Sequence, residues 1–258
     1  MRVYRFFLLF CLGSSLLAAQ SDTNSSLSPN YWFANVNVNY FDWNNQAEAD
    51  TNKGDYSYFG VEGGAGWQGV DLYTFLNIEN PTHEYKEDSQ RDLRFSAFGD
   101  LDVSLYKNFK LHFQDFALNS GSYYVNDFII GFAYKLDTDF GLWFRPFLGV
   151  HHTYDSYYKG LNGYMTGWLF NYDFSMFSYK FTLFQWNEIE FGRHKEFYLN
   201  SSGESVGDGE SWGLNGAISL WMHINKIFTV GLQYRYANNK LGYQDYQAGT
   251  IYTIKYNF

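Results

Sequence analysis

Large aromatic and ionisable side chains recur at every second position in several stretches of the sequence. In the run 184–192, these positions hold Trp186, Glu188 and Glu190. Side chains two residues apart on a β-strand point to the same side, so such a strand presents rings and carboxylates on one face. Aromatic rings stack on nucleobases with little regard to base identity, worth ~1–3 kcal/mol per base, and polar groups beside them can hold a ribose or a base edge. The pattern therefore predicts reversible binding of a small, flat, polar solute.

Other predicted strands also place aromatic, acidic and basic residues at every second position, on the face that we expect to point inward. These candidate substrate-binding residues are Tyr73, Phe75, Glu79, Asp100, Trp143, Arg145, Phe147, Trp186, Glu188, Glu190, Trp221 and Arg235. The alternative is that the rings only fill space inside a narrow protein. Acids outnumber bases at the inward positions, which disfavours anionic solutes and favours neutral or cationic ones.

Catalytic and metal chemistry are not indicated by the spacing of the histidines and acids. A membrane lipase needs a Ser beside a His that a third residue orients, and His152, on an outward register, has no Ser or Asn close in sequence. His151 and His152 are consecutive, so on a strand they point to opposite faces and cannot share an ion. Asp208 and Glu210 are compatible with calcium, but solvation of a surface loop explains them as well. We expect no enzymatic activity, no cofactor and no metal.

The last ten residues show the kind of element that positions such side chains. One face carries Thr250, Tyr252, Ile254, Tyr256 and Phe258, and the other carries Ile251, Thr253, Lys255 and Asn257. An aromatic face opposite a more polar one suits a wall between lipid and water. A strand that ends on an aromatic residue resembles the closing strand of bacterial outer-membrane barrels, whose terminus is an assembly signal. We therefore expect the barrel-insertion machinery to recognise the strand that ends on Phe258.

Similar alternation elsewhere predicts an all-β protein, a transmembrane antiparallel up-and-down β-barrel of about twelve strands. In the run 34–40, for example, Val36 and Val38 alternate with Asn35, Asn37 and Asn39. Long polar connections alternate with short turns, which matches the long extracellular loops and short periplasmic turns of outer-membrane barrels. The long connections include Asn44–Gly54, Asn80–Arg91 and Gly192–Ser211, and the short ones include Gly69, Lys107–Asn108 and Asn225–Lys226.

Two positions fit this pattern poorly. Phe113 and Phe116 cannot share one face of a strand without a bulge, which leaves the register of the fifth predicted strand open. Pro146 lies within the seventh predicted strand, where it cannot donate a ladder hydrogen bond.

The N-terminus has the features of a secretory signal peptide. Arg2 and Arg5 precede a short apolar run and small residues, so residues 1–19 are predicted to be the signal peptide and residues 20–258 the barrel. The single cysteine, Cys11, lies in the signal peptide, so the exported chain is expected to contain no disulfide. No later run approaches the ~20 apolar residues of a membrane-spanning helix.

Charge and composition also narrow the class of protein. Without the two signal-peptide arginines, 16 basic residues face 27 acidic ones, a net charge of −11. Nucleic acid is then an unsuitable partner, because phosphate binding needs a basic surface. Aromatic residues make up 22% of the chain while the mean hydropathy stays negative. Aromatic girdles around a polar lumen produce this combination, so the expected location is the outer membrane of a Gram-negative bacterium, with lipid around the barrel.

Three runs of the sequence and its overall layout resemble one family of barrels. The runs are Asp71–Pro81, Phe184–Gly192 and the closing Tyr256–Phe258. Over nearly the whole exported chain, the protein resembles the Tsx family of nucleoside-specific outer-membrane channels. The resemblance implies a monomeric twelve-stranded barrel with a narrow lumen of aromatic and ionisable side chains, which binds nucleosides weakly as they pass.

The resemblance also suggests roles for some of the candidate residues. Base-stacking residues would be Tyr73, Phe75 and Trp186, and partners for polar groups would be Glu79, Glu188 and Glu190. The functional prediction is an outer-membrane channel for passive uptake of small hydrophilic solutes, with nucleosides as the favoured substrate. The alternatives are a general diffusion porin, an outer-membrane enzyme and a barrel that serves as a surface receptor.

Overall fold

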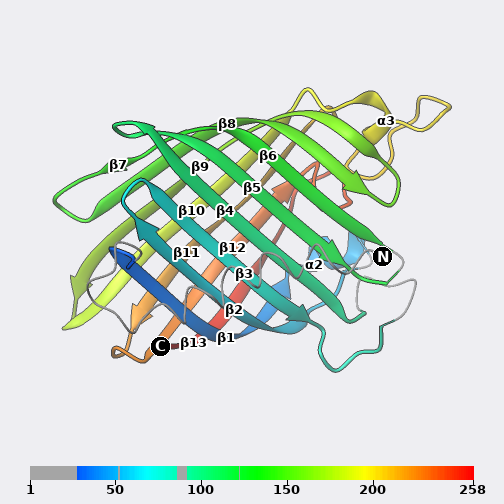
Figure 1. Cartoon of the computed structure of the whole chain (residues 1–258). Helices are drawn as coiled ribbons and strands as arrows, with labels where there is room; N and C mark the ends of the chain where they lie inside the picture. The colour runs from blue at the N-terminus through cyan, green and yellow to red at the C-terminus, as the bar shows by residue number, and fades with distance from the viewer. Residues whose placement is uncertain (1–27, 52, 86–91, 122) are drawn as a thin grey trace.

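A computed structural model describes residues 28–51, 53–85, 92–121 and 123–258 (Figure 1). The predicted signal peptide lies outside the described residues. Within them, no helix is long and apolar enough to cross a membrane.

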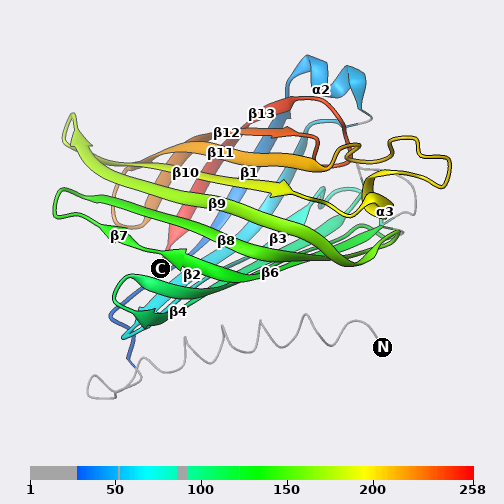
Figure 2. The same cartoon turned by 90° about the horizontal axis from the view of Figure 1, so that it is seen from above.

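The described chain forms one antiparallel sheet that closes on itself (Figures 1 and 2). The closing pair is β1 with β13, in which Val36 lies opposite Tyr256. The twelve strands of the barrel are β1 (Tyr31–Trp43), β2 (Tyr56–Trp67), β3 (Val70–Glu79), β4 (Arg94–Tyr106), β5 (Phe109–Asn119), β6 (Tyr124–Tyr134), β8 (Leu142–Asp155), β9 (Lys159–Met176), β10 (Tyr179–Phe191), β11 (Trp212–His223), β12 (Phe228–Asn238) and β13 (Gln247–Asn257). The predicted fold class is confirmed.

The alternation of side chains in the sequence becomes the inner and outer face of the wall. On β1, Val36 and Val38 are 40% and 52% exposed on the outside, whereas Asn35 and Asn39 are buried inside. The inner amides form a ladder along the strand, in which Asn37 Nδ2 donates to Asn35 Oδ1 at 3.0 Å. A polar side chain inside a narrow barrel thus finds a partner on its own strand.

Pro146 lies at a break in the sheet. The short β7 (Leu136–Asp137) pairs with β8 up to Phe144, and β6 pairs with β8 from Phe147 onward. Pro146 falls between these two ladders, so its missing N–H removes no ladder hydrogen bond on that side. The break between β6 and β7 thus coincides with Pro146 on β8.

The register of β5 has no irregularity between Phe113 and Phe116, the two residues whose faces the sequence does not decide. Phe113 lies opposite Ile130, which is exposed on the outer wall, and Phe116 lies opposite Asp127 on the inner wall. No bulge separates them in the pairing of β5 with β6. Phe116 is thus an additional inward ring.

The two ends of the barrel differ. The long connections lie at one end and carry two short helices, α2 (Asn45–Asp50) and α3 (Lys195–Tyr198), where the polar sequence predicts plain loops (Figure 1). Asn44 caps α2 by accepting a hydrogen bond from Ala47 N at 2.8 Å. The opposite end has tight turns, such as the one at Gly69 with φ of 88°. Following the loop-length asymmetry, we call the loop-bearing end the extracellular mouth.

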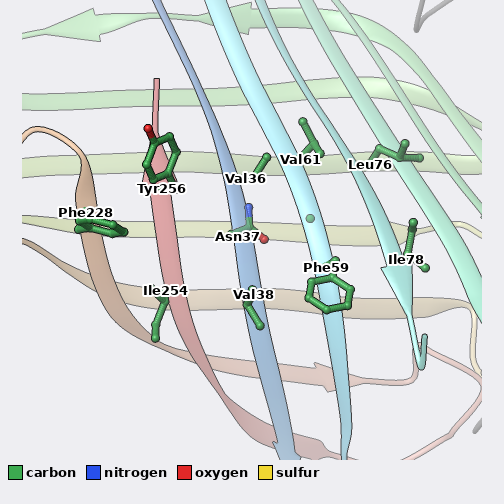
Figure 3. Close-up of a pocket in the computed structure, with 11 residues that line it drawn as sticks. Val36, Asn37, Val38, Phe59, Val61, Leu76, Ile78, Phe228, Ile254 and Tyr256 are labelled. Atoms are coloured by element: carbon green, nitrogen blue, oxygen red, sulfur yellow. The ribbon is translucent and has the colours of Figure 1, made fainter. Parts of the chain in front are cut away.

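The outer wall is apolar over β1, β2, β3 and β13. A shallow groove there is lined by outward side chains, which include Val36, Val38, Phe59, Val61, Leu76, Ile78, Ile254 and Tyr256 (Figure 3). Such a surface suits the hydrocarbon tails of lipid and not water.

Candidate functional site: the lumen

The strand register places the whole set of candidate residues on the inner face. Tyr73 lies opposite Asp100 between β3 and β4, and Trp186 and Arg145 both lie opposite Leu169 of β9. The inward orientation follows the period of two in each strand. Tertiary contacts then divide these residues into groups with different access to a solute.

One side of the lumen is filled by apolar packing. Ile129 and Ala133 of β6, Phe147 of β8 and Met165 of β9 form a buried cluster. The ring of Phe147 lies 4.7 Å from the ring of His112, and Phe147 is only 4% exposed. Phe147 therefore supports the wall in this structure and presents no free face to a solute.

A buried charge cluster lies beside this packing. Arg145 Nη1 donates to Asp100 Oδ1 at 2.9 Å and to Asp102 Oδ2 at 2.7 Å. Asp102 Oδ1 is 2.8 Å from His112 Nδ1, and all four side chains are nearly inaccessible. The two carboxylates and the imidazole are close enough together to hold a metal ion, but the Arg145 guanidinium already supplies the positive charge there.

A hydrogen bond across the lumen separates this filled side from the rest. Gln114 Nε2 of β5 donates to Glu188 Oε1 of β10 at 2.5 Å, although β5 and β10 are not neighbours in the sheet. Glu188 Oε2 accepts from Asn215 Nδ2 at 3.4 Å. On the other side of this bond, along β1 to β4 and β10 to β13, the inward rings of Tyr73, Phe75 and Trp186 are half-buried and not buried; we call this side the open part of the lumen.

Those walls carry half-buried aromatic rings. Phe75 stacks on Phe98 with the ring centroids 5.3 Å apart, and Tyr73 contacts both rings. The Tyr73 hydroxyl donates to Glu62 Oε2 at 2.9 Å. Phe33 stacks on Tyr73 with a centroid distance of 6.2 Å. Together they form a ladder of rings along one wall of the open part.

A second group of rings on the facing walls carries cations. The guanidinium carbon of Arg235 lies 4.3 Å from the centroid of Trp186, and Lys255 Nζ lies 3.9 Å from that of Trp221. Lys255 also forms an ion pair with Glu62 at 2.5 Å. By contrast, no described carboxylate lies within 4.0 Å of Arg235, and Arg235 Nη1 has no hydrogen-bond partner among the described residues. Trp186, Glu188 and Arg235 thus lie together in the open part.

The remaining acidic candidates, Glu79 and Glu190, form ion pairs with cationic side chains of the protein. Glu79 forms an ion pair with Arg94 at 2.6 Å and accepts from Ser96 Oγ at 2.9 Å. Glu190 lies at the extracellular mouth and accepts from Arg193 Nε at 2.7 Å and from Lys240 Nζ. Both carboxylates are therefore engaged by the protein itself.

The sequence does not predict the roles of Arg193 and Lys240. Both lie in loops, after β10 and β12, where side chains do not alternate between two faces as they do on a strand. Lys240 reaches from its loop to Asp127 of β6, with Nζ 3.5 Å from Oδ2. Burial lowers the pKa of Lys240, but the carboxylates of Glu190 and Asp127 raise it more, so it lies above its usual range. Asp127, His151 and Glu190 are close enough to hold a metal ion, and the Lys240 ammonium contacts both carboxylates of this cluster.

Lys53, in the loop between β1 and β2, is a buried lysine at the same mouth. Its Nζ donates to the carbonyl of Leu241 at 3.0 Å and to the side chain of Gln247, and lies 4.8 Å from the ring centroid of Trp43. Burial lowers the pKa of Lys53 to about 7. This amine therefore changes charge near neutral pH while it ties two loops together.

We expect the docking of the 44–55 loop to depend on pH through Lys53. An undocked lysine has a pKa of about 10.4, so between about pH 7 and pH 10.4 the undocked loop binds more protons, and docking becomes more stable as the pH rises. Below about pH 7 this lysine adds no further dependence, because it is protonated in both states. Hydrogen exchange of residues 44–51, corrected for intrinsic rates, should slow across that window in the wild type and not in Lys53→Met. Equal slopes in the two proteins would contradict the assignment.

These features define a class of protein: a closed, lipid-facing barrel of the outer membrane with a narrow polar lumen, which is a channel. The chain belongs to the family of the nucleoside-specific channel-forming protein Tsx, whose family model matches residues 30–258. The family consists of channels, so the enzymatic alternative is excluded.

Two of the solved structures to which the chain is similar are described as porins. The NanC porin has a TM-score of 0.51 at 10% identity, covering 86% of this chain and 98% of that one. The KdgM porin, solved in complex with disordered oligogalacturonate, has a TM-score of 0.45 at 10% identity, covering 88% and 99%. At such low identity, the NanC comparison supports the porin-like fold alone.

Proposed function

We propose that nucleosides pass through the open part of the lumen with the base stacked on the rings of Tyr73, Phe75 and Trp186. Stacking on aromatic rings tolerates any base, because every base has a π-face. The three rings are half-buried, which leaves part of each surface available. Phe147, Asp100, Arg145 and Glu190 would act indirectly, by filling one side of the lumen and so narrowing the route.

The observation that carries the proposal is the group formed by Trp186, Arg235 and Glu188. Arg235 lies opposite Ala217, which lies opposite Trp186, and this small buried residue lets the guanidinium rest on the indole. Glu188 follows two residues after Trp186 on the same face. The site therefore offers a ring, an unpaired donor and a carboxylate acceptor side by side. Every nucleobase edge carries donors or acceptors that such a pair can bind, whereas a sugar lacks the flat face.

Single-channel recording in a planar bilayer tests the proposal. Adenosine, uridine and thymidine should each reduce the ionic current, and a neutral sugar at the same concentration should not. A current indifferent to all four solutes would favour a general diffusion porin instead.

The role of the polar pair can be separated from channel function with two substitutions and one modified ligand. Arg235→Gln and Glu188→Gln should each weaken the block by uridine, by about 10- to 150-fold for one hydrogen bond to a charged group. 3-Methyluridine, which lacks the N3–H donor, should bind the wild type more weakly than uridine and bind Glu188→Gln about as well as uridine does. If both ligands block all proteins equally, the edge-binding role is wrong even though nucleosides still block.

Three further aspects of the function belong to the same proposal. The barrel acts as a monomer embedded in outer-membrane lipid, after removal of residues 1–19. The strand β13 with the Phe258 that follows it is the segment that the insertion machinery recognises; its outward Tyr252, Ile254 and Tyr256 are exposed, which supports this role. Deletion of Phe258 should lower the amount of folded barrel in the outer membrane, measured by its heat-modifiable mobility on a gel.

A further inference from the structure

The extracellular mouth contains a buried ion network that the proposed nucleoside route does not use. Lys240, in the loop between β12 and β13, contacts Glu190 of β10 and Asp127 of β6. In the sheet order, β6 lies on the opposite side of the barrel from β12 and β13. The lysine therefore draws the 239–246 loop inward across the mouth.

Other contacts tie this loop to the neighbouring 192–211 loop. Arg193 Nη1 donates to the carbonyl of Asn239 at 2.9 Å, while its Nε binds Glu190 at 2.7 Å. Asp208 Oδ1 accepts from Gly242 N at 2.7 Å, and its other oxygen lies 3.4 Å from Arg193 Nη2. The two loops and the wall thus share one network of charges.

The loop that Lys240 holds has a strained backbone. Leu241 has a φ of 63°, in the left-handed region that residues other than Gly, Asn and Asp rarely adopt. Its neighbours Asn239 and Gly242, with φ of 48° and 77°, belong to residue types that adopt this region at little cost. Leucine in particular has no local hydrogen bond to offset this conformation. A conformation of this kind persists only where surrounding contacts hold it. The ion network supplies some of those contacts, and Lys53, whose Nζ donates to the carbonyl of Leu241 at 3.0 Å, supplies another.

The wall beneath the network contains a buried histidine that is only partly hydrogen-bonded. His151 Nε2 is 3.0 Å from Asp127 Oδ1, but its Nδ1 has no hydrogen-bond partner among the described residues and lies 4.0 Å from Glu190 Oε2. The carboxylates that face Lys240 are Asp127 and Glu190 from the wall and Asp208 from the loop, and the other cation is Arg193. Lys240 is thus one of two cations that neutralise three carboxylates.

We propose that the 239–246 loop is a gate over the extracellular mouth and that the ammonium of Lys240, bound to Glu190 and Asp127, is its latch. With the latch closed, the loop narrows the mouth. When the latch is released, the strained loop relaxes outward and the mouth widens. The gate acts on every permeating ion and solute, so it does not depend on the binding of nucleosides in the lumen.

Single-channel recording without any nucleoside tests the gate. Lys240→Met removes the charge at similar length, and because loss of one partner from a buried ion pair is strongly unfavourable, the ratio of open to closed dwell times should rise by on the order of a hundredfold. Lys195→Met, on the exposed helix α3 at the same mouth, is the matched control and should behave as the wild type. Lys240→Arg keeps the charge, so its ratio of open to closed dwell times should be closer to that of the wild type than the ratio of Lys240→Met.

A second design covers the case in which Lys240→Met does not fold because it leaves carboxylates without a partner. The triple variant Lys240→Met, Asp127→Asn, Glu190→Gln has neither the latch nor the uncompensated charges. Asp127→Asn with Glu190→Gln, which keeps the lysine, removes only its partners. The triple variant should fold, as judged by heat-modifiable mobility, and the double variant is checked in the same way. Each folded variant should have a raised ratio of open to closed dwell times. Wild-type dwell times in these two folded variants would overturn the proposal, whether or not uridine still blocks the current.

Discussion

Replacement of Arg145 by Met is expected to destabilise the barrel by about 3–5 kcal/mol, because it leaves Asp100 and Asp102 buried without their cation. The guanidinium bonds both carboxylates and is only 5% exposed, so water cannot take its place without opening the packing. Unfolding by denaturant in lipid vesicles, followed by tryptophan fluorescence, measures the change. We also expect a larger ionic conductance, because this cluster fills one side of the lumen.

The control restores the balance of charge without restoring the arginine. Arg145→Met combined with Asp100→Asn and Asp102→Asn should recover most of the lost stability, since neutral amides no longer repel each other. If the single substitution is neutral, or if the triple variant is as unstable as the single one, then charge compensation is not what Arg145 provides.

Replacing Tyr73, Phe75 and Trp186 together by Ala is expected to abolish the block of current by nucleosides. Loss of even one stacking contact of ~1–3 kcal/mol should weaken binding by about 5- to 150-fold, and the three losses together should take it out of the measurable range. The same variant should conduct more ions, because three large rings leave the lumen. Current block by adenosine, recorded with the open-channel conductance, measures both effects.

The matched control removes the same three residue types from the outer wall. Tyr252, Phe132 and Trp168 face lipid, so their replacement by Ala should lower stability and leave the block unchanged. Unchanged block in the lumen variant, with the larger conductance present, would show that the rings fill space only. That outcome would favour the space-filling interpretation of the inward aromatics.

Several features of the fold follow from the sequence because a strand has a fixed period. The alternation in β1 and β13 correctly separated lipid-facing from inward residues, and the long and short connections alternated as observed. The position of Phe116 did not follow, because an isolated pair of phenylalanines three residues apart fits either register. Pairing with β6, where Phe116 faces Asp127, decides it. The helices α2 and α3 were missed because each is too short to show a helical pattern of apolar residues.

Alternation along each strand is enough to predict which side chains face the lumen, since the period of a strand and its composition are local properties. Tertiary structure alone decided which of them remain open to a solute. Arg145 is buried by its bonds to Asp100 of β4, and Phe147 is buried by packing against β9. Gln114 donates a hydrogen bond to Glu188 across the barrel. Trp186 keeps Arg235 beside it without a carboxylate partner. Lys240 enters the mouth from a loop that has no period. Each of these outcomes depends on distances between strands far apart in the chain, which closure of the barrel sets and which no local pattern contains.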